Sequence, residues 1–232
     1  MAFISISEAI SKYSYPGAGI LAGKSEDSSN ILTACFICGR DDESMSRRFV
    51  EEGGGVVIEP SGSITRANLI YQPVLAFENK ILIGNGTHTE HIFSDLAEGK
   101  SFGRAVREQV CLDDGPEYMP RITALIDMAE NDFFMDMRLT KAADAEGRGI
   151  LRNAFKFSEL PEGCGALLTM YAPDGDTAFT GEPAAVHIEG SIFDMVADIW
   201  ENLNPASRVS LWVRQTDMKS HKCISRIINR VR

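Results

Sequence analysis

The sequence predicts an α+β fold in which helices cover antiparallel sheets. Short apolar runs separated by turn residues occupy most of the chain, and an amphipathic helix pattern occurs near its end. The sequence contains no internal repeat, no low-complexity tract and no linker long enough to separate domains. We therefore expect one domain over residues 1–232.

The first part of the chain alternates short strands with turns. The expected strands are rich in β-branched and apolar residues and are bounded by Gly, Pro, Asp or Asn; they cover 19–22, 30–38, 55–59, 68–77 and 80–83. The Gly53-Gly54-Gly55 run lacks the Gly-Lys-Ser/Thr ending of a P-loop, so we interpret it as a connector.

Two helices should follow these strands. They are predicted over 89–98 and 102–111, with Gly99-Lys-Ser between them and Asp113-Asp-Gly-Pro as a stop signal. Further strands are expected over 121–127, 133–139, 165–171 and 183–188.

The end of the chain has one helix and one late strand. Apolar residues from Ile192 to Leu203 recur with the spacing of an amphipathic helix. Alternation over 208–213 predicts a half-buried strand. The basic tail from Met218 onward is interpreted as a solvated face, with an oligomer contact as the alternative.

Composition restricts the class of protein. The chain is 44% apolar and 24% charged, which is typical of a globular protein with ample core. Its formal net charge of −10 disfavours a nucleic-acid partner, because such partners require clustered basic residues. No apolar run reaches the roughly 18 residues of a spanning helix, and residues 1–14 do not resemble a secretory signal. We expect a cytoplasmic protein without a membrane partner.

The cysteines and histidines do not suggest a metal or a cofactor. The 5 cysteines are irregularly spaced, which favours reduced thiols. Cys35 and Cys38 have the spacing of a zinc or redox pair, but no second pair follows, and residues i and i+3 of a strand point to opposite faces. We therefore expect both to pack as core residues. His88 and His91 have no third ligand nearby, so a metal role is disfavoured.

The segments around Tyr71 and Asn85 are the strongest indication of a binding site. Two apolar runs lead to a tyrosine and to an Asn-Gly-Thr-His-Thr turn at an expected helix start. Helix N-termini carry free N–H groups and partial positive charge, so this neighbourhood suits a small polar or anionic ligand. Because the chain is acidic, a local basic cluster would have to hold such an anion.

Several short motifs occur in one order over residues 15 to 130, and weaker ones follow over 171–176 and 179–183. They are Ile37-Cys-Gly-Arg, Ser46-Arg47, Phe49-Val-Glu-Glu-Gly, Leu69-Ile-Tyr-Gln-Pro, Asn85-Gly-Thr-His-Thr and Tyr118-Met-Pro-Arg-Ile. This order resembles the archaeal-type inosine monophosphate (IMP) cyclohydrolase family, whose members are stand-alone enzymes. The resemblance implies a four-layered αββα sandwich like that of N-terminal-nucleophile hydrolases. Residues 1–15 precede the first expected core strand, so a terminal nucleophile is not expected.

The activity implied by the resemblance is closure of 5-formamidoimidazole-4-carboxamide ribotide to IMP with loss of water. No cofactor is implied, and the expected partner is a small purine ribonucleotide; a homo-oligomer is also expected. Two alternatives stay open. One is a purine-ribotide-binding or repurposed relative with little activity, and the other is an amide hydrolase of related fold, which would need an activated cysteine.

The resemblance and the side-chain chemistry together suggest site residues. Arg40 and Arg47 could bind phosphate or polarise a carbonyl, with an ion pair to nearby acids as the alternative. Tyr71 matches the family's active-site tyrosine, and a core aromatic is its alternative. Arg121 follows Pro120 at an expected strand start and is assigned to the site on the resemblance.

The turn after the second apolar run supplies the remaining expected substrate contacts. Asn85, Gly86, Thr87, His88 and Thr89 could hold the base or the phosphate, and a cap between hairpin and helix is the alternative.

The family also has an acidic residue before its Pro-Arg-Ile motif. Asp113 is preferred as the proton acceptor over Asp114 and Glu117. One departure from the family pattern concerns Ala18, which stands where relatives usually have an arginine.

Overall fold

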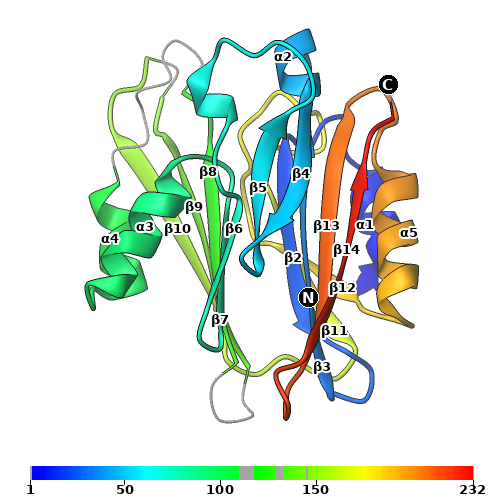
Figure 1. Ribbon diagram of the computed structural model, residues 1–232. Coiled ribbons are helices and arrows are strands. Elements are labelled where there is room, and N and C mark those ends of the chain that lie inside the picture. Colours follow the sequence, from blue (N-terminus) through cyan, green and yellow to red (C-terminus); the bar gives the residue numbers. More distant parts are fainter. Residues whose placement is uncertain (1, 110–117, 129–132, 145, 232) are drawn as a thin grey trace.

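Figure 1 shows the computed structural model, which describes residues 2–109, 118–128, 133–144 and 146–231. Two seven-stranded sheets pack face to face, and helices lie on the outer face of each. The predicted combination of large sheets and few helices is confirmed. Within the described residues, no helix is long and apolar enough to cross a bilayer.

The first sheet has the strand order β1-β12-β11-β2-β3-β13-β14. Its strands are β1 (Ile4–Ser5), β2 (Ala18–Lys24), β3 (Asn30–Cys38), β11 (Cys164–Thr169), β12 (Ala184–His187), β13 (Arg208–Asp217) and β14 (Cys223–Asn229). Neighbouring strands are antiparallel except for β1 and β12. The central strands are buried on both faces, because the second sheet covers one face and helices cover the other.

The second sheet has the order β10-β9-β8-β7-β6-β5-β4 and is antiparallel throughout. Its strands are β4 (Arg47–Glu52), β5 (Gly55–Pro60), β6 (Val74–Phe77), β7 (Lys80–Gly84), β8 (Arg121–Asp127), β9 (Phe134–Ala142) and β10 (Ile150–Phe157). Its inner face joins that of the first sheet in one hydrophobic core.

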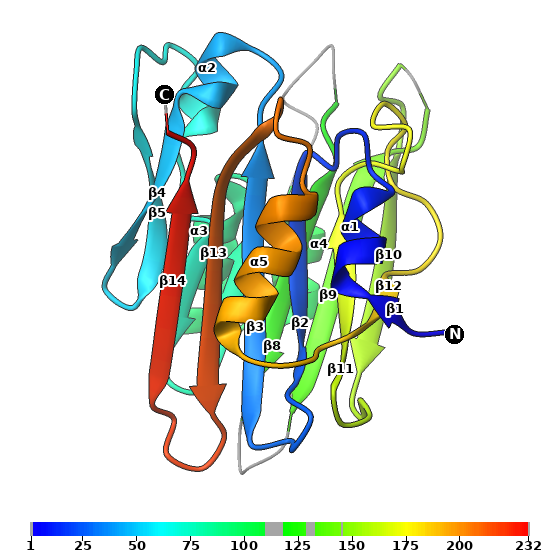
Figure 2. The ribbon, with the colours of Figure 1, turned by 90° about the vertical axis from the view of Figure 1, so that its right-hand side faces the viewer.

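In the part of the chain that the structure describes, two helices cover each sheet. Helices α1 (Ile6–Ser11) and α5 (Ile192–Asn202) pack on the first sheet, as Figure 2 shows. Helices α3 (His88–Ala97) and α4 (Phe102–Glu108) pack on the second. The amphipathic pattern predicted α5 correctly, because Ile192, Met195 and Ile199 are buried. Two short helical turns, α2 (Asp42–Met45) and η1 (Ala67–Leu69), lie in the connections next to β4 and β6.

The interpretation of the cysteine pair is confirmed. Cys35 is buried in the core between the sheets, and Cys38 is buried under the helices of the first sheet. Both thiols are free, and burial raises the pKa of each to about 12. The alternating directions of strand side chains account for their separation.

The strand predicted over 68–77 is wrong in its first half. Residues 67–69 form η1, and β6 begins only at Val74. Pro73 has no N–H to contribute to a ladder, so the chain joins the sheet after it. Tyr71 therefore lies in an extended connection, where its carbonyl accepts one hydrogen bond from Ile58 N at 3.1 Å.

Three other predictions about elements need correction. The late strand is not half-buried, because Ser210 and Trp212 are as buried as Leu211; the second sheet covers the face that alternation assigned to solvent. The basic tail is not only a solvated face, since 223–229 pairs with β13. Helix α4 ends at Glu108 rather than continuing to 111. Strands β1, β4 and β10 and helix α1 were not predicted.

Candidate active site

A cavity of about 440 Å³ lies between the two sheets, at the end where β3 stops and β4 and β8 begin. We call it the inter-sheet cavity. Its lining residues come from both sheets and from the connecting segments: Tyr15, Gly17, Ala18, Ile37, Cys38, Arg40, Asp41, Ser44, Arg47, Arg66, Asn68, Leu69, Tyr71, Asn85, Met119, Arg121, Met170, Tyr171 and Asp176. Four arginines and two aspartates are among them. Basic side chains thus collect here in a chain of net charge −10.

Arg47 is a buried cation in the wall of this cavity. Arg47 is the first residue of β4 and is 7% exposed. The guanidinium donates from Nε to the Ser44 carbonyl at 2.8 Å and from Nη2 to the Cys38 carbonyl at 3.0 Å. Among the described residues, no carboxylate forms an ion pair with it. A buried cation without a counterion is costly, so an anionic or strongly polar ligand would stabilise this arrangement.

A tight turn brings the Ser44 carbonyl to Arg47. Asp41 and Ser44 form a reciprocal capping box around α2, in which Asp41 Oδ1 accepts from Ser44 N at 2.9 Å. Gly39 permits this close approach, because a Cβ there would lie 2.7 Å from the Ser44 carbonyl carbon. The loop between β3 and β4 is therefore folded to hold the arginine.

Tyr71 lies next to Arg47 and is 6% exposed. Burial raises the pKa of its hydroxyl to about 12, and the neighbouring Arg47 guanidinium, which also hydrogen-bonds to it, acts in the opposite direction. The hydroxyl is therefore protonated at neutral pH. It can donate a hydrogen bond to an oxygen atom in the cavity.

The guanidinium of Arg40 packs on the rings of Tyr15 and Tyr171, and the three side chains form one wall of the cavity. Its guanidinium carbon lies 4.0 Å from the centre of the Tyr15 ring and 5.4 Å from that of Tyr171. Arg40 Nη2 also donates to the Gly175 carbonyl and, at 3.0 Å, to Asp176 Oδ1. This wall has flat faces on which a planar base can stack.

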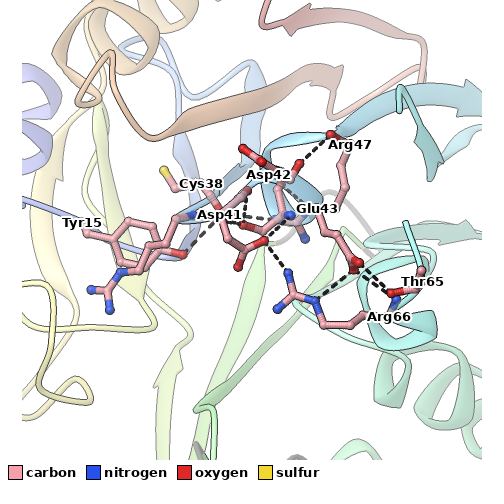
Figure 3. Close-up of polar contacts among 11 residues, drawn as sticks. Tyr15, Cys38, Asp41, Asp42, Glu43, Arg47, Thr65 and Arg66 are labelled. Atoms are coloured by element: carbon pink, nitrogen blue, oxygen red, sulfur yellow. Dashed lines mark hydrogen bonds and ion pairs between the residues drawn. The ribbon is translucent and has the colours of Figure 1, made fainter. Parts of the chain in front are cut away.

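Arg66 is a cavity residue that sequence reasoning missed. Figure 3 shows it between Asp41 and Glu43: Nη2 pairs with Asp41 Oδ1, and Nε donates to Glu43 Oε2 at 3.1 Å. Thr65 Oγ1 donates to Glu43 at 2.6 Å, and this bond, together with Arg66, lowers the pKa of Glu43 to about 2. Arg66 stands in a polar loop two residues before Asn68, so proximity to the neighbouring motif was its only signal in the sequence.

Asn85 places Arg121 at the cavity. Asn85 Nδ2 donates to the Pro120 carbonyl at 2.9 Å, and Oδ1 accepts from Ile122 N at 2.9 Å. The two bonds flank Arg121, so they tie the end of β7 to the start of β8 on either side of it. Asn85 and Arg121 both line the cavity.

The rest of the predicted Asn-Gly-Thr-His-Thr cluster does not line the inter-sheet cavity. Thr87 is exposed, whereas Thr89 is buried and donates from Oγ1 to the Gly86 carbonyl at 2.7 Å. A Cβ on Gly86 would lie 2.9 Å from Arg121 Nη1, so this glycine lets the arginine pass closely. A ligand role for Gly86, Thr87, His88 and Thr89 stays a prediction.

His88 is the first residue of α3, and its side chain is buried. Its Nε2 lies 3.0 Å from Thr123 Oγ1, and Nδ1 has no hydrogen-bond partner among the described residues. Burial, followed by the charge of Arg121, lowers the pKa of the imidazole to about 3. His88 is therefore neutral at physiological pH.

Two further predictions concern Asp113, as the proton acceptor, and Ala18, as a departure from the family pattern. Asp113, Asp114 and Glu117 lie outside the described residues, so Asp113 as proton acceptor stays a prediction. Ala18 begins β2, is 4% exposed and lines the cavity.

In the part of the chain that the structure describes, no group of three or more His, Cys, Asp or Glu side chains is arranged to hold a metal ion.

Comparison with protein families places the chain. The model of a family described as IMP cyclohydrolase-like protein matches residues 15–220. No curated protein matches the chain.

Proposed function

The chain belongs to the IMP cyclohydrolase-like family, and on that premise we propose that it closes 5-formamidoimidazole-4-carboxamide ribotide to IMP with loss of water. The family match spans the cavity-lining residues from Tyr15 to Asp176. The proposed substrate is thus a small purine ribonucleotide that binds in the inter-sheet cavity.

The observation that carries this proposal is the pairing of Arg47 with Tyr71. A buried guanidinium without a carboxylate partner among the described residues lies beside a phenol that stays protonated. Both groups are hydrogen-bond donors in a largely desolvated place. Donors of this kind stabilise negative charge that develops on an oxygen atom during a reaction.

Ring closure makes use of such donors. The carboxamide nitrogen adds to the formyl carbon and loses one proton, and the formyl oxygen gains negative charge. After protonation that oxygen leaves as water, while the formamido nitrogen loses its proton and forms the new C=N bond. We assign Arg47 and Tyr71 to the formyl oxygen, with Tyr71 as its proton donor. Holding the two ends of the substrate together contributes further, since orientation can account for about 7 to 11 kcal/mol of an intramolecular barrier in favourable cases.

The remaining cavity residues suit the other parts of the substrate. We assign the phosphate to the side of Arg40 and Arg66, whose guanidinium groups still have N–H donors beyond those in their ion pairs. The rings of Tyr15 and Tyr171 offer a stacking surface to the planar imidazole. Asp113 is proposed as the acceptor of the amide proton. We also propose that the layered sandwich is related to that of N-terminal-nucleophile hydrolases.

A second function is favoured by Ala18. An alanine that lines the cavity supplies no charge where relatives usually have an arginine. This supports a purine-ribotide-binding or repurposed relative with little cyclohydrolase activity. An amide hydrolase is less well supported, because the buried Cys35 and Cys38 thiols have pKa values of about 12 and stay protonated.

The proposal is tested by ultraviolet detection of IMP formation from the formamido ribotide, in the presence of a chelator. Tyr71→Phe should lower kcat by about a hundredfold or more, because it removes the proton donor. Tyr13→Phe is the control, since Tyr13 is also buried but does not line the cavity. An uncatalysed rate in a folded wild-type protein that still binds IMP would instead support the ribotide-binding relative.

A further inference from the structure

A second cavity lies on the outer side of the second sheet. It has a volume of about 270 Å³ and is lined by residues of α4, β9 and β10: Gly103, Val106, Arg107, Arg138, Thr140, Arg152, Asn153 and Ala154. We call it the arginine cavity. It shares no lining residue with the inter-sheet cavity. In Figure 1, α4 lies over β9 and β10 on the side away from the first sheet.

The lining of the arginine cavity is basic. It contains three arginines and no aspartate or glutamate. Among the described residues, Asp136 is the counterion of Arg138: it accepts from Arg138 Nε at 2.5 Å and from Nη2 at 2.6 Å. This pairing holds the Arg138 guanidinium in one orientation and compensates only one of the three charges.

Arg152 is also held in place, by neutral groups. Its Nη2 donates to the carbonyls of Arg107 and Gln109, at 3.2 and 3.4 Å, where α4 ends. A helix C-terminus attracts a cation, so these bonds orient Arg152 without neutralising it.

Arg107 completes the cluster. It is exposed, and within the described residues its guanidinium forms no hydrogen bond or ion pair. Arg104, on the same helix, differs in this respect, because its Nε pairs with Glu108 at 2.7 Å. Gly103 lies close to the Arg138 guanidinium, since a Cβ there would be in ordinary contact with Nη2 at 3.4 Å.

We infer that the arginine cavity binds a phosphate group, supplied either by inorganic phosphate or by a nucleotide. Guanidinium groups recognise phosphate oxygens through charge-assisted hydrogen bonds. Two oriented arginines, together with Arg107, which has no partner in the part of the chain that the structure describes, supply these donors from β9, β10 and α4. The inference does not depend on the reaction proposed for the inter-sheet cavity.

The test is calorimetric titration of the whole protein with inorganic phosphate and, separately, with adenosine monophosphate, at constant ionic strength. Arg107→Ala should weaken binding by about three- to tenfold, because one charge-assisted contact is lost. Arg104→Ala is the matched control: it removes the same charge from the same helix, outside the cavity. It should leave the affinity within about twofold.

The two probes distinguish the sources of the phosphate group. Equal dependence of both probes on Arg107 assigns the cavity to phosphate in general, and dependence of the nucleotide alone assigns it to a nucleotide. Either result supports the inference. It is overturned if neither probe binds, or if Arg107→Ala and Arg104→Ala change the affinities equally. Circular dichroism of each variant verifies that it is folded.

Discussion

The side chain of Asn229 makes both hydrogen bonds that the backbone of Phe49 offers at the edge of its sheet. Asn229 Oδ1 accepts from the Phe49 N–H at 2.9 Å, and Nδ2 donates to the Phe49 carbonyl at 3.0 Å. Phe49 lies in β4 and Asn229 in β14, which are edge strands of different sheets. One side chain thus fastens the two sheets together close to Arg47, which begins β4.

Asn229→Ala should lower the free energy of unfolding by about 2 kcal/mol, because it leaves two Phe49 backbone groups without partners. Urea denaturation measures this change. Asn202→Ala is the control, since it removes one side-chain bond, to the Asp198 carbonyl within α5, at 3.0 Å. We expect it to change stability by less than about 0.5 kcal/mol. Equal losses in the two variants would contradict the role of Asn229.

Arg47→Lys should reduce kcat/KM for IMP formation by about a hundredfold. Lysine keeps the charge but lacks the planar fork that reaches the carbonyls of Ser44 and Cys38 while facing Tyr71. Arg48→Lys is the matched control, because Arg48 is the next residue, is exposed and pairs with Glu59 at 2.7 Å. Steady-state kinetics of both variants should separate them by at least tenfold, and similar kinetics would exclude a special role for Arg47.

Stability should depend on the protonation of His88. The pKa of its imidazole is about 3 in the folded chain, below the ordinary histidine value of 6.5, so the unfolded chain binds the proton more readily. The contribution of His88 to stability is therefore complete above about pH 6.5 and is lost as the pH falls toward 3. The slope due to one such group is at most about 1.4 kcal/mol per pH unit.

Denaturation of the wild type and of His88→Gln at pH 7 and pH 5 measures this contribution. The variant should lose less stability than the wild type on acidification. His91→Gln, on the exposed side of the same helix, should behave like the wild type. If His88→Gln also loses as much stability as the wild type, His88 is not the group that titrates.

The cysteines should differ in reactivity. Among the four described cysteines, Cys223 is exposed, whereas Cys35, Cys38 and Cys164 are buried. Burial raises the pKa of all three buried thiols, so little thiolate is present at neutral pH. Brief alkylation of the native protein followed by peptide mass mapping should label Cys223 at least tenfold faster than these three. Rapid labelling of Cys35 or Cys38 would contradict this prediction and support the amide-hydrolase alternative.

Periodic patterns in the sequence predicted the regular elements that lie deep in the fold. The run 30–38 identifies β3, because a strand that is covered on both faces is a continuous apolar run. The spacing from Ile192 to Leu203 identifies α5, because side chains on one face of a helix recur every 3.6 residues, as those on one face of a strand recur every 2. The same logic separated Cys35 from Cys38. It was misleading at Tyr71, where Pro73 delays the start of the strand, and in β13, where a second sheet covers the face assigned to solvent.

The sequence by itself determined the layers of apolar residues, the small number of helices and the motifs that carry Arg47, Tyr71 and Arg121. Only the tertiary structure decided which of the predicted site residues share a cavity. Arg40, Arg47, Tyr71, Asn85 and Arg121 line it together with the unpredicted Arg66, whereas Gly86, Thr87, His88 and Thr89 do not. The physical reason is that long-range pairing of strands and side-chain hydrogen bonds such as those of Asn85 set these directions, and neither leaves a periodic trace in the chain.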